Sequence, residues 1–197
     1  MENNYLNEYY SCYDEEGRLL SQHGQVEYLT TMKYIRDALA GLSDPAILEV
    51  GAGTGRYSVT LAKEGFRVTA VELIEHNLEQ RRSKLDGSEP IVAIKGNALD
   101  LSFLPDDAFD LTMLLGPMYH LYDEADKRQC LAEAKRVAKA DGVIMTAYCM
   151  NDPSMFTYCF SGDGSLLWEQ LDGGHLGEDF RFSSEPKEIF EVYRVED

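Results

Sequence analysis

A glycine-rich stretch that joins an apolar segment to a helical one constrains the fold of this chain more than any other feature. The stretch reads Glu49-Val50-Gly51-Ala52-Gly53-Thr54-Gly55 and closes the apolar residues 46–50. Its glycines permit a tight turn and let the backbone approach a ligand without obstruction by Cβ atoms. A helix that begins behind the turn presents free N–H groups to a carboxylate or a phosphate. The stretch therefore predicts a strand, a ligand-binding turn and a helix, in that order.

Apolar segments and amphipathic segments alternate around this turn. Strands are predicted over residues 46–50, 67–71, 91–94, 109–115 and 143–148, and helices over residues 25–39, 56–63, 74–85 and 123–139. Apolar residues at helical spacing are expected to face the core: Val26, Leu29, Met32, Ile35 and Leu39 in the first helix, and Ala125, Leu131, Ala134, Val137 and Ala138 in the last. A turn is expected at Asp141-Gly142. Apolar strands separated by helices indicate a Rossmann-like, doubly wound α/β fold, with a mostly parallel sheet covered by helices on both faces.

The residues around the glycine turn indicate which ligand it binds. The spacing is G-x-G-x-G, whereas dinucleotide-binding enzymes carry G-x-G-x-x-G. Glu49 would repel a pyrophosphate but suits a ligand with an ammonium group. Glu72 ends the second strand, 19 residues after Gly53, where a carboxylate accepts hydrogen bonds from ribose hydroxyls. NAD-binding proteins share that device, so Glu72 alone indicates only a nucleoside. Both carboxylates together favour S-adenosylmethionine (SAM), which carries an ammonium, a carboxylate and a sulfonium group.

The ordered set of segments resembles a known family. Residues 47–55 and 68–73 are similar to the first two motifs of class I SAM-dependent methyltransferases. Three further matches follow in the family's order: the adenine loop at residues 95–101, the fourth strand at residues 109–116, and the helix and turn at residues 132–142. The resemblance covers roughly residues 25–150.

The resemblance implies a role for each residue around the cofactor. Glu49 would hold the methionine end of SAM together with the loop residues Gly51, Ala52, Gly53 and Gly55. Glu72 would hold the ribose, Leu73 would lie against the adenine, and Leu115 would complete the cofactor contacts. Asn97 and Ala98 would read the adenine edge. The family often has Asp in place of Asn97, but the amide oxygen of Asn can accept the same hydrogen bond.

Two segments are expected to complete the site. The loop at residues 116–121 follows the fourth strand, and in this family that loop faces the methyl group. His120 could remove a proton from the acceptor with Tyr119 lining the same pocket; alternatively, His120 caps a helix or shapes the pocket and Tyr119 only packs. At the N-terminus, Tyr9, Tyr13 and His23 could fold over the cofactor as a lid, or this segment could simply pack or fray.

The chain is expected to form one domain over residues 1–197. Its parts are an N-terminal cap at residues 1–40, a cofactor-binding core at 41–150, and a variable segment at 151–197 with a short helix over 186–194. The family completes its sheet with an antiparallel strand pair that we do not find after residue 150. We expect the segment to be truncated, which would leave a sheet edge open for pairing with a second copy. A rebuilt tail is the alternative.

Charge and cysteine usage limit the partners. The formal net charge is -17, which argues against nucleic acid and against an anionic membrane surface as partners. The most basic run, residues 81–84, is interpreted as the solvated end of a helix. Cys12, Cys130, Cys149 and Cys159 show no metal-ligand spacing, so no metal site is expected. Scattered thiols and an N-terminus without a signal-peptide pattern predict a cytosolic location.

The sequence thus predicts a SAM-dependent methyltransferase that acts on a small molecule. Three alternatives stay open at this stage. The chain could be a non-enzymatic SAM-binding or regulatory module, because no acceptor site is recognisable. It could be an NAD-dependent oxidoreductase, or it could methylate a protein.

Overall fold

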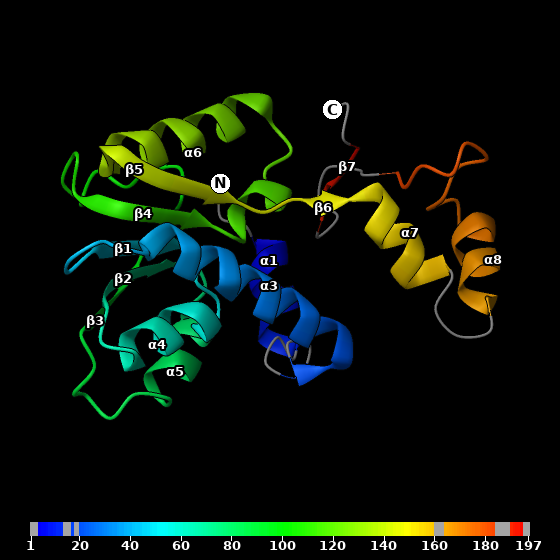
Figure 1. The fold of residues 1–197 in the computed structure, drawn as a ribbon. Coiled ribbons are helices and arrows are strands. Elements are labelled where there is room, and N and C mark those ends of the chain that lie inside the picture. Colours follow the sequence, from blue (N-terminus) through cyan, green and yellow to red (C-terminus); the bar gives the residue numbers. More distant parts are fainter. Residues whose placement is uncertain (1–3, 14–16, 18–19, 160–163, 184–189, 195–197) are drawn as a thin grey trace.

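The computed structural model contains a five-stranded sheet in which all neighbouring strands are parallel (Figure 1). It describes residues 4–13, 17, 20–159, 164–183 and 190–194. The strands are β1 (Ala46–Val50), β2 (Arg67–Glu72), β3 (Ile91–Lys95), β4 (Phe109–Leu114) and β5 (Ala138–Thr146), in the spatial order β3-β2-β1-β4-β5. The predicted Rossmann-like fold is therefore confirmed. The strand order reverses between β1 and β4, where ligands bind in such sheets.

Helices cover both faces of the sheet. They are α3 (Gln22–Leu39), α4 (Arg56–Lys63), α5 (Glu75–Arg82) and α6 (Glu124–Val137), and α1 (Asn4–Cys12) packs against α5. Neighbouring residues of one strand pack into different hydrophobic cores, because successive side chains of a strand point to opposite faces of the sheet. Ile47 packs with α3 and α4, whereas Leu48 packs with α6. The two cores lie on opposite sides of the sheet (Figure 1).

The predicted apolar stripes are only partly correct. In α3, Met32, Ile35 and Leu39 are buried, but Val26 and Leu29 are more than 60% exposed. The helix also begins earlier than predicted, because the Ser21 side chain caps it by accepting a hydrogen bond from the Gly24 amide. In α6, Ala134 and Val137 are buried as predicted, and so is Ala138, which is the first residue of β5. Leu131 and Ala125 are exposed, and Cys130 takes the inward position instead.

The prediction that a turn at Asp141-Gly142 separates the last helix from the fifth strand is wrong. α6 ends at Val137 and β5 begins at the next residue, so Asp141-Gly142 lies inside β5. There the pairing with β4 shifts register between Phe109 and Leu111. A Cβ atom at Gly142 would lie 2.9 Å from the Phe109 carbonyl oxygen. The glycine is thus required by close approach of two strands within a bulge.

The segment after residue 150 differs most from the prediction. It holds two unpredicted helices, α7 (Asn151–Cys159) and α8 (Ser165–Asp172), which pack around Met155, Cys159 and Leu176. The expected helix over residues 186–194 is wrong at its end, because Val192–Tyr193 form β7, which pairs in parallel with β6 (Cys149–Met150). The rest of that expected helix, up to residue 189, lies outside the described residues. No helix in the described ranges combines the length and the apolar character that crossing a membrane requires.

Candidate cofactor and acceptor site

The glycine loop lies at the carboxyl end of β1 and is pressed against the loop that follows β4. The amides of Gly51 and Ala52 donate to the Val71 carbonyl at 2.9 and 3.1 Å, which ties the loop to β2. Gly51 has a φ of +71°, and a Cβ atom there would lie 2.7 Å from the Pro117 Cδ atom. Only glycine fits this position, because both its backbone conformation and its closeness to Pro117 exclude a side chain.

Gly53 lies at the tip of the loop and faces open space. Its φ is +53°, and a Cβ atom built there would meet no heavy atom within 4 Å. Its amide donates to the Glu72 Oε2 atom at 2.7 Å, which joins the tip of the loop to the end of β2. Behind it, Gly55 precedes α4 as the N-cap residue. The loop therefore offers bare backbone to a ligand on one side and opens a helix on the other.

A cavity of about 900 Å³ runs along the carboxyl ends of the strands. Most residues that the sequence placed at the cofactor line it: Glu49, Gly51, Ala52, Gly53, Glu72, Leu73, Asn97, Ala98, Leu115 and Tyr13. Tyr119 and His120 line it as well. Gly55 and Tyr9 are not among its lining residues. His23 lies in the first turn of α3, but its side chain is outside the described part of the structure. The volume suits a ligand of drug size or larger.

Glu49 is the second-last residue of β1 and is 2% exposed. Its Oε2 atom accepts a hydrogen bond from the Ser58 amide at 3.0 Å. Burial raises the pKa of the Glu49 carboxyl to about 7, although the Ser58 hydrogen bond and the charge of Arg81 act in the opposite direction. At neutral pH the carboxyl is thus poised between its neutral and ionised forms. A nearby ammonium group would draw it toward the ionised form.

Glu72 ends β2 beside the loop and is also buried. Its Oε1 atom accepts from the Ile74 amide at 2.8 Å and from the Asn77 side chain at 3.4 Å, while Oε2 accepts from Gly53. Burial raises the pKa of this carboxyl, and these hydrogen bonds lower it. A carboxylate has about four lone-pair positions, so three protein bonds leave capacity for a hydroxyl of the ligand.

The loop after β3 forms the next wall of the cavity. Asn97 and Ala98 line the cavity, and the Asn97 Oδ1 atom accepts from the Leu99 amide at 3.0 Å. One lone pair of that oxygen remains for a ligand. The Gln129 side chain on α6 donates to the Leu99 carbonyl at 3.3 Å. The loop is thus held from the side opposite the cavity.

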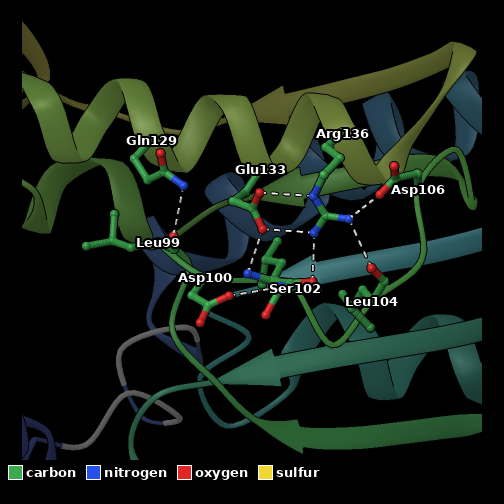
Figure 2. Close-up of polar contacts among 9 residues, drawn as sticks. Leu99, Asp100, Ser102, Leu104, Asp106, Gln129, Glu133 and Arg136 are labelled. Carbon is green, nitrogen blue, oxygen red and sulfur yellow. Dashed lines mark hydrogen bonds and ion pairs between the residues drawn. The ribbon is translucent and has the colours of Figure 1, made fainter.

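Arg136 on α6 fixes the remainder of this loop (Figure 2). Its guanidinium donates to the carbonyls of Leu101 and Leu104 at 2.8 and 3.0 Å. Glu133, one turn earlier, pairs with Arg136 at 2.8 Å and accepts from the Leu101 amide at 2.7 Å. Arg136 holds the pKa of the Glu133 carboxyl below its usual range. The network lies outside the cavity, and it positions the loop that carries Asn97.

Aromatic side chains line another part of the cavity. His120 lies among Tyr10, Tyr119 and Phe190, with ring centroids 4.7 to 5.7 Å from its own. The Tyr10 hydroxyl lies 2.9 Å from the His120 Nε2 atom. The Tyr119 hydroxyl donates to the Leu115 carbonyl at 3.1 Å, which leaves its ring as the wall. The N-terminal segment therefore contacts the loop after β4 through the hydrogen bond between Tyr10 and His120.

Of the two N-terminal tyrosines expected at the site, Tyr13 lines the cavity and Tyr9 does not. Tyr10 and Tyr13 line the cavity. Tyr9 stacks on Tyr13 at 4.7 Å and meets the Phe190 ring at 6.0 Å, so it supports the wall from behind. On a helix, residues three positions apart share a face, so the lining role of Tyr13 marks Tyr10 as its neighbour. That spacing was the one signal in the sequence that could have found Tyr10.

Residues 47–142 match the family described as a methyltransferase domain. A demethylmenaquinone methyltransferase from Clavibacter sepedonicus is 33% identical over 136 residues, which are 68% of this chain and 52% of that protein. The chain thus spans about half the length of this curated relative.

Solved structures show the same similarity. Phosphoethanolamine N-methyltransferase 1 from Haemonchus contortus, in complex with phosphoethanolamine and S-adenosylhomocysteine, has a TM-score of 0.61 at 25% identity. The match covers 74% of this chain and 31% of that one. A SAM-dependent methyltransferase from Leishmania major has a TM-score of 0.62 at 20% identity, covering 75% of this chain and 61% of that one, and shares the fold.

Proposed function

The chain belongs to the class I SAM-dependent methyltransferase family, and on this premise we propose that it transfers the methyl group of SAM to a small molecule bound beside His120. One observation carries the proposal. A single cavity is lined both by the buried carboxylates Glu49 and Glu72 and by Tyr10 and His120. The first pair suits the cofactor and the second suits an acceptor, so one cavity can hold both reactants side by side.

The residues around the glycine loop fit SAM group by group. Glu49 offers a carboxylate for the ammonium group, and the backbone ahead of α4 offers amides for the carboxylate. Glu72 retains capacity for a ribose hydroxyl beyond its bonds to Gly53 and Ile74. The open space in front of Gly53 gives the cofactor room against the loop.

The chain's contribution to the reaction is chiefly alignment and exclusion of water. Bound SAM supplies an electrophilic methyl carbon on its sulfonium, and S-adenosylhomocysteine is the product. The aromatic walls formed by Tyr119 and Phe190 keep water from the acceptor. We propose that the Tyr10–His120 pair receives the proton that the acceptor loses, since its 2.9 Å contact allows transfer between the two groups.

A small acceptor is favoured over a macromolecule by the enclosure and the charge of the chain. The N-terminal segment covers part of the cavity, where Tyr10 contacts His120 directly. The net charge of -17 disfavours nucleic acid. A protein acceptor would have to enter the same enclosed space with a side chain. A regulatory module that binds SAM without turnover is the remaining alternative.

Transfer of labelled methyl groups separates these functions. The purified chain would be incubated with SAM labelled in its methyl group, once with a pool of small metabolites and once with proteins from a cell lysate. We expect label in the small-molecule fraction. Label confined to protein would support a protein methyltransferase, and SAM binding without any transfer would support a regulatory module.

His120→Ala is expected to leave the affinity for SAM within about threefold of wild type, because the proposal places His120 beside the acceptor and not at the cofactor. Turnover of an acceptor that loses a proton is expected to fall about 100-fold, the usual contribution of a general base. Calorimetry with S-adenosylhomocysteine and steady-state kinetics measure the two effects separately.

Tyr10→Phe is the matched variant for His120, because it keeps the ring against His120 and removes only the hydroxyl. We expect a smaller loss of turnover than for His120→Ala and an unchanged affinity for SAM. A large loss of SAM affinity in His120→Ala would place this residue at the cofactor. Unchanged turnover would show that the histidine only shapes the wall.

A further inference from the structure

Arg81 on α5 is a buried cation that has no role in the proposed cofactor and acceptor site described above. Its side chain is 0% exposed, and none of its three guanidinium nitrogens has a hydrogen-bond partner among the described residues. The interpretation of residues 81–84 as a solvated helix end is therefore wrong for Arg81, whereas Arg82 is exposed and pairs with Glu75. Burying a guanidinium without hydrogen bonds is costly, so its presence calls for a compensating interaction.

The stem of Arg81 lies directly behind the glycine loop. A Cβ atom at Gly55 would lie 2.6 Å from the Arg81 Cδ atom and 2.7 Å from its Cγ atom. Arg81 does not line the cavity. It therefore meets the loop from the protein side, while a ligand would meet the loop from the cavity side.

The two carboxylates of the proposed cofactor site interact electrostatically with Arg81. Glu49 and Glu72 both attract its guanidinium, and both keep its pKa from falling as far as burial alone would lower it. The same charge lowers the pKa of both carboxyls against the effect of burial. Arg81 thus offsets part of the repulsion between two buried acids.

Other charged groups near this cluster do not replace Arg81. Arg82, its neighbour on α5, opposes it electrostatically. Glu8 on α1, the helix that packs against α5, is exposed. On the far side of the loop, Lys84 donates to the Thr54 carbonyl, and Arg56 lies over the Tyr28 ring. Among the described residues, Arg81 is the buried cation that acts on both Glu49 and Glu72.

We propose that Arg81 is a positioning residue for SAM, whose buried charge keeps Glu49 and Glu72 ionised so that they can accept hydrogen bonds from the ammonium and ribose groups. The inference rests on the proposed function in that it takes SAM as the ligand. A neutral Glu49 would not attract an ammonium group. In a protonated Glu72, the added O–H would face the amide donor of Gly53 or of Ile74. Arg81 acts through these two side chains and does not touch the ligand.

The test is the pH dependence of binding of S-adenosylhomocysteine, which carries the same ammonium and ribose groups and does not react. Calorimetry would follow its affinity from about pH 6 to about pH 8.5. In the wild type the affinity is complete above the Glu49 pKa of about 7 and falls as the pH drops through it, because binding needs the carboxylate.

Arg81→Met is expected to move the midpoint of that profile upward by about one pH unit or more. The affinity at pH 7 is then about fivefold or more below that of the wild type, and it recovers toward the wild-type value as the pH rises. Arg82→Met removes a neighbouring cation from the surface and is expected to leave the midpoint unchanged. A loss of affinity by the same factor at every pH, or no loss, would overturn the proposal and leave Arg81 a packing role.

A second measurement keeps the proposal testable if Arg81→Met is too unstable for calorimetry. Combining it with Glu49→Gln removes one buried carboxylate together with the cation, so the double variant is expected to have a higher Tm than Arg81→Met alone. A double variant with no higher Tm would contradict charge compensation. Failure of the proposed function has a different signature, namely a wild-type chain that binds S-adenosylhomocysteine but transfers no methyl group.

Discussion

Glu72→Ala is expected to weaken binding of SAM about 100-fold, the largest loss from any single side chain in the cavity. Hydrogen bonds to a charged group contribute roughly 1.5–3 kcal/mol each, and about 2.7 kcal/mol corresponds to a factor of 100. The substitution removes the ribose acceptor, and it also releases the Gly53 amide from the end of β2. Calorimetry with S-adenosylhomocysteine measures the loss.

Two variants control for this interpretation. Glu75→Ala removes an exposed glutamate from the start of α5, which pairs with Lys95 at the surface, and we expect its affinity to stay at the wild-type value. Glu72→Gln is expected to bind almost as poorly as Glu72→Ala. Both carboxylate oxygens accept from backbone amides, so an amide nitrogen would face either Gly53 or Ile74 donor to donor. Unchanged affinity in Glu72→Ala would show that the end of β2 does not hold the ribose.

Gly53→Ala is expected to reduce the affinity for SAM at least 30-fold while costing roughly 1–2 kcal/mol of stability. The stability cost is that of placing an L-residue at a φ of +53°. The new methyl group would meet no protein atom within 4 Å, so it would occupy space that the cofactor needs. Thermal unfolding and calorimetry separate the two effects.

Gly65→Ala is the matched control for Gly53→Ala. Gly65 also has a positive φ, +95°, and a Cβ atom there likewise meets nothing within 4 Å. Gly65 is not among the residues that line the cavity. We expect a comparable or larger drop in Tm with full affinity for SAM. If Gly53→Ala bound SAM as tightly as Gly65→Ala does, the loop would not be in contact with the cofactor.

The cofactor half of the site was predictable because it depends on local sequence and on one rule of topology. The glycine turn between residues 50 and 56 sets its own backbone conformation, and Glu72 ends the next strand. The carboxyl ends of parallel strands meet at one edge of the sheet, so the two motifs come together wherever the strands pair. The spacing together with this rule places Gly53 and Glu72 side by side, and in the structure the two residues share a hydrogen bond.

The acceptor half depends on contacts between distant segments, which spacing does not encode. Tyr10 and His120 are 110 positions apart and meet only because the N-terminal segment folds over the cavity. Phe190 reaches the same ring from the far end of the chain. Arg81 was misread because its neighbour Arg82 is exposed, and a pair of arginines ordinarily indicates a solvated helix end.

The segment after residue 150 was misread for a related reason. The sequence predicted one short helix there, over residues 186–194, yet α7 and α8 form a small cluster of their own around Met155 and Leu176. Among the described side chains of α7, Asn151, Met155 and Cys159 are buried, and α8 contributes no buried residue. A weakly buried helix leaves a weak apolar pattern in the sequence.

The central claim is that the cavity at the carboxyl ends of the strands binds SAM. Calorimetry of the wild-type chain with SAM, S-adenosylhomocysteine and NAD tests it most directly. We predict binding of SAM and S-adenosylhomocysteine at one site per chain, with no displacement of either by NAD, because Glu49 lies where a pyrophosphate would have to approach the loop. Tight binding of NAD together with no response to SAM would contradict this account.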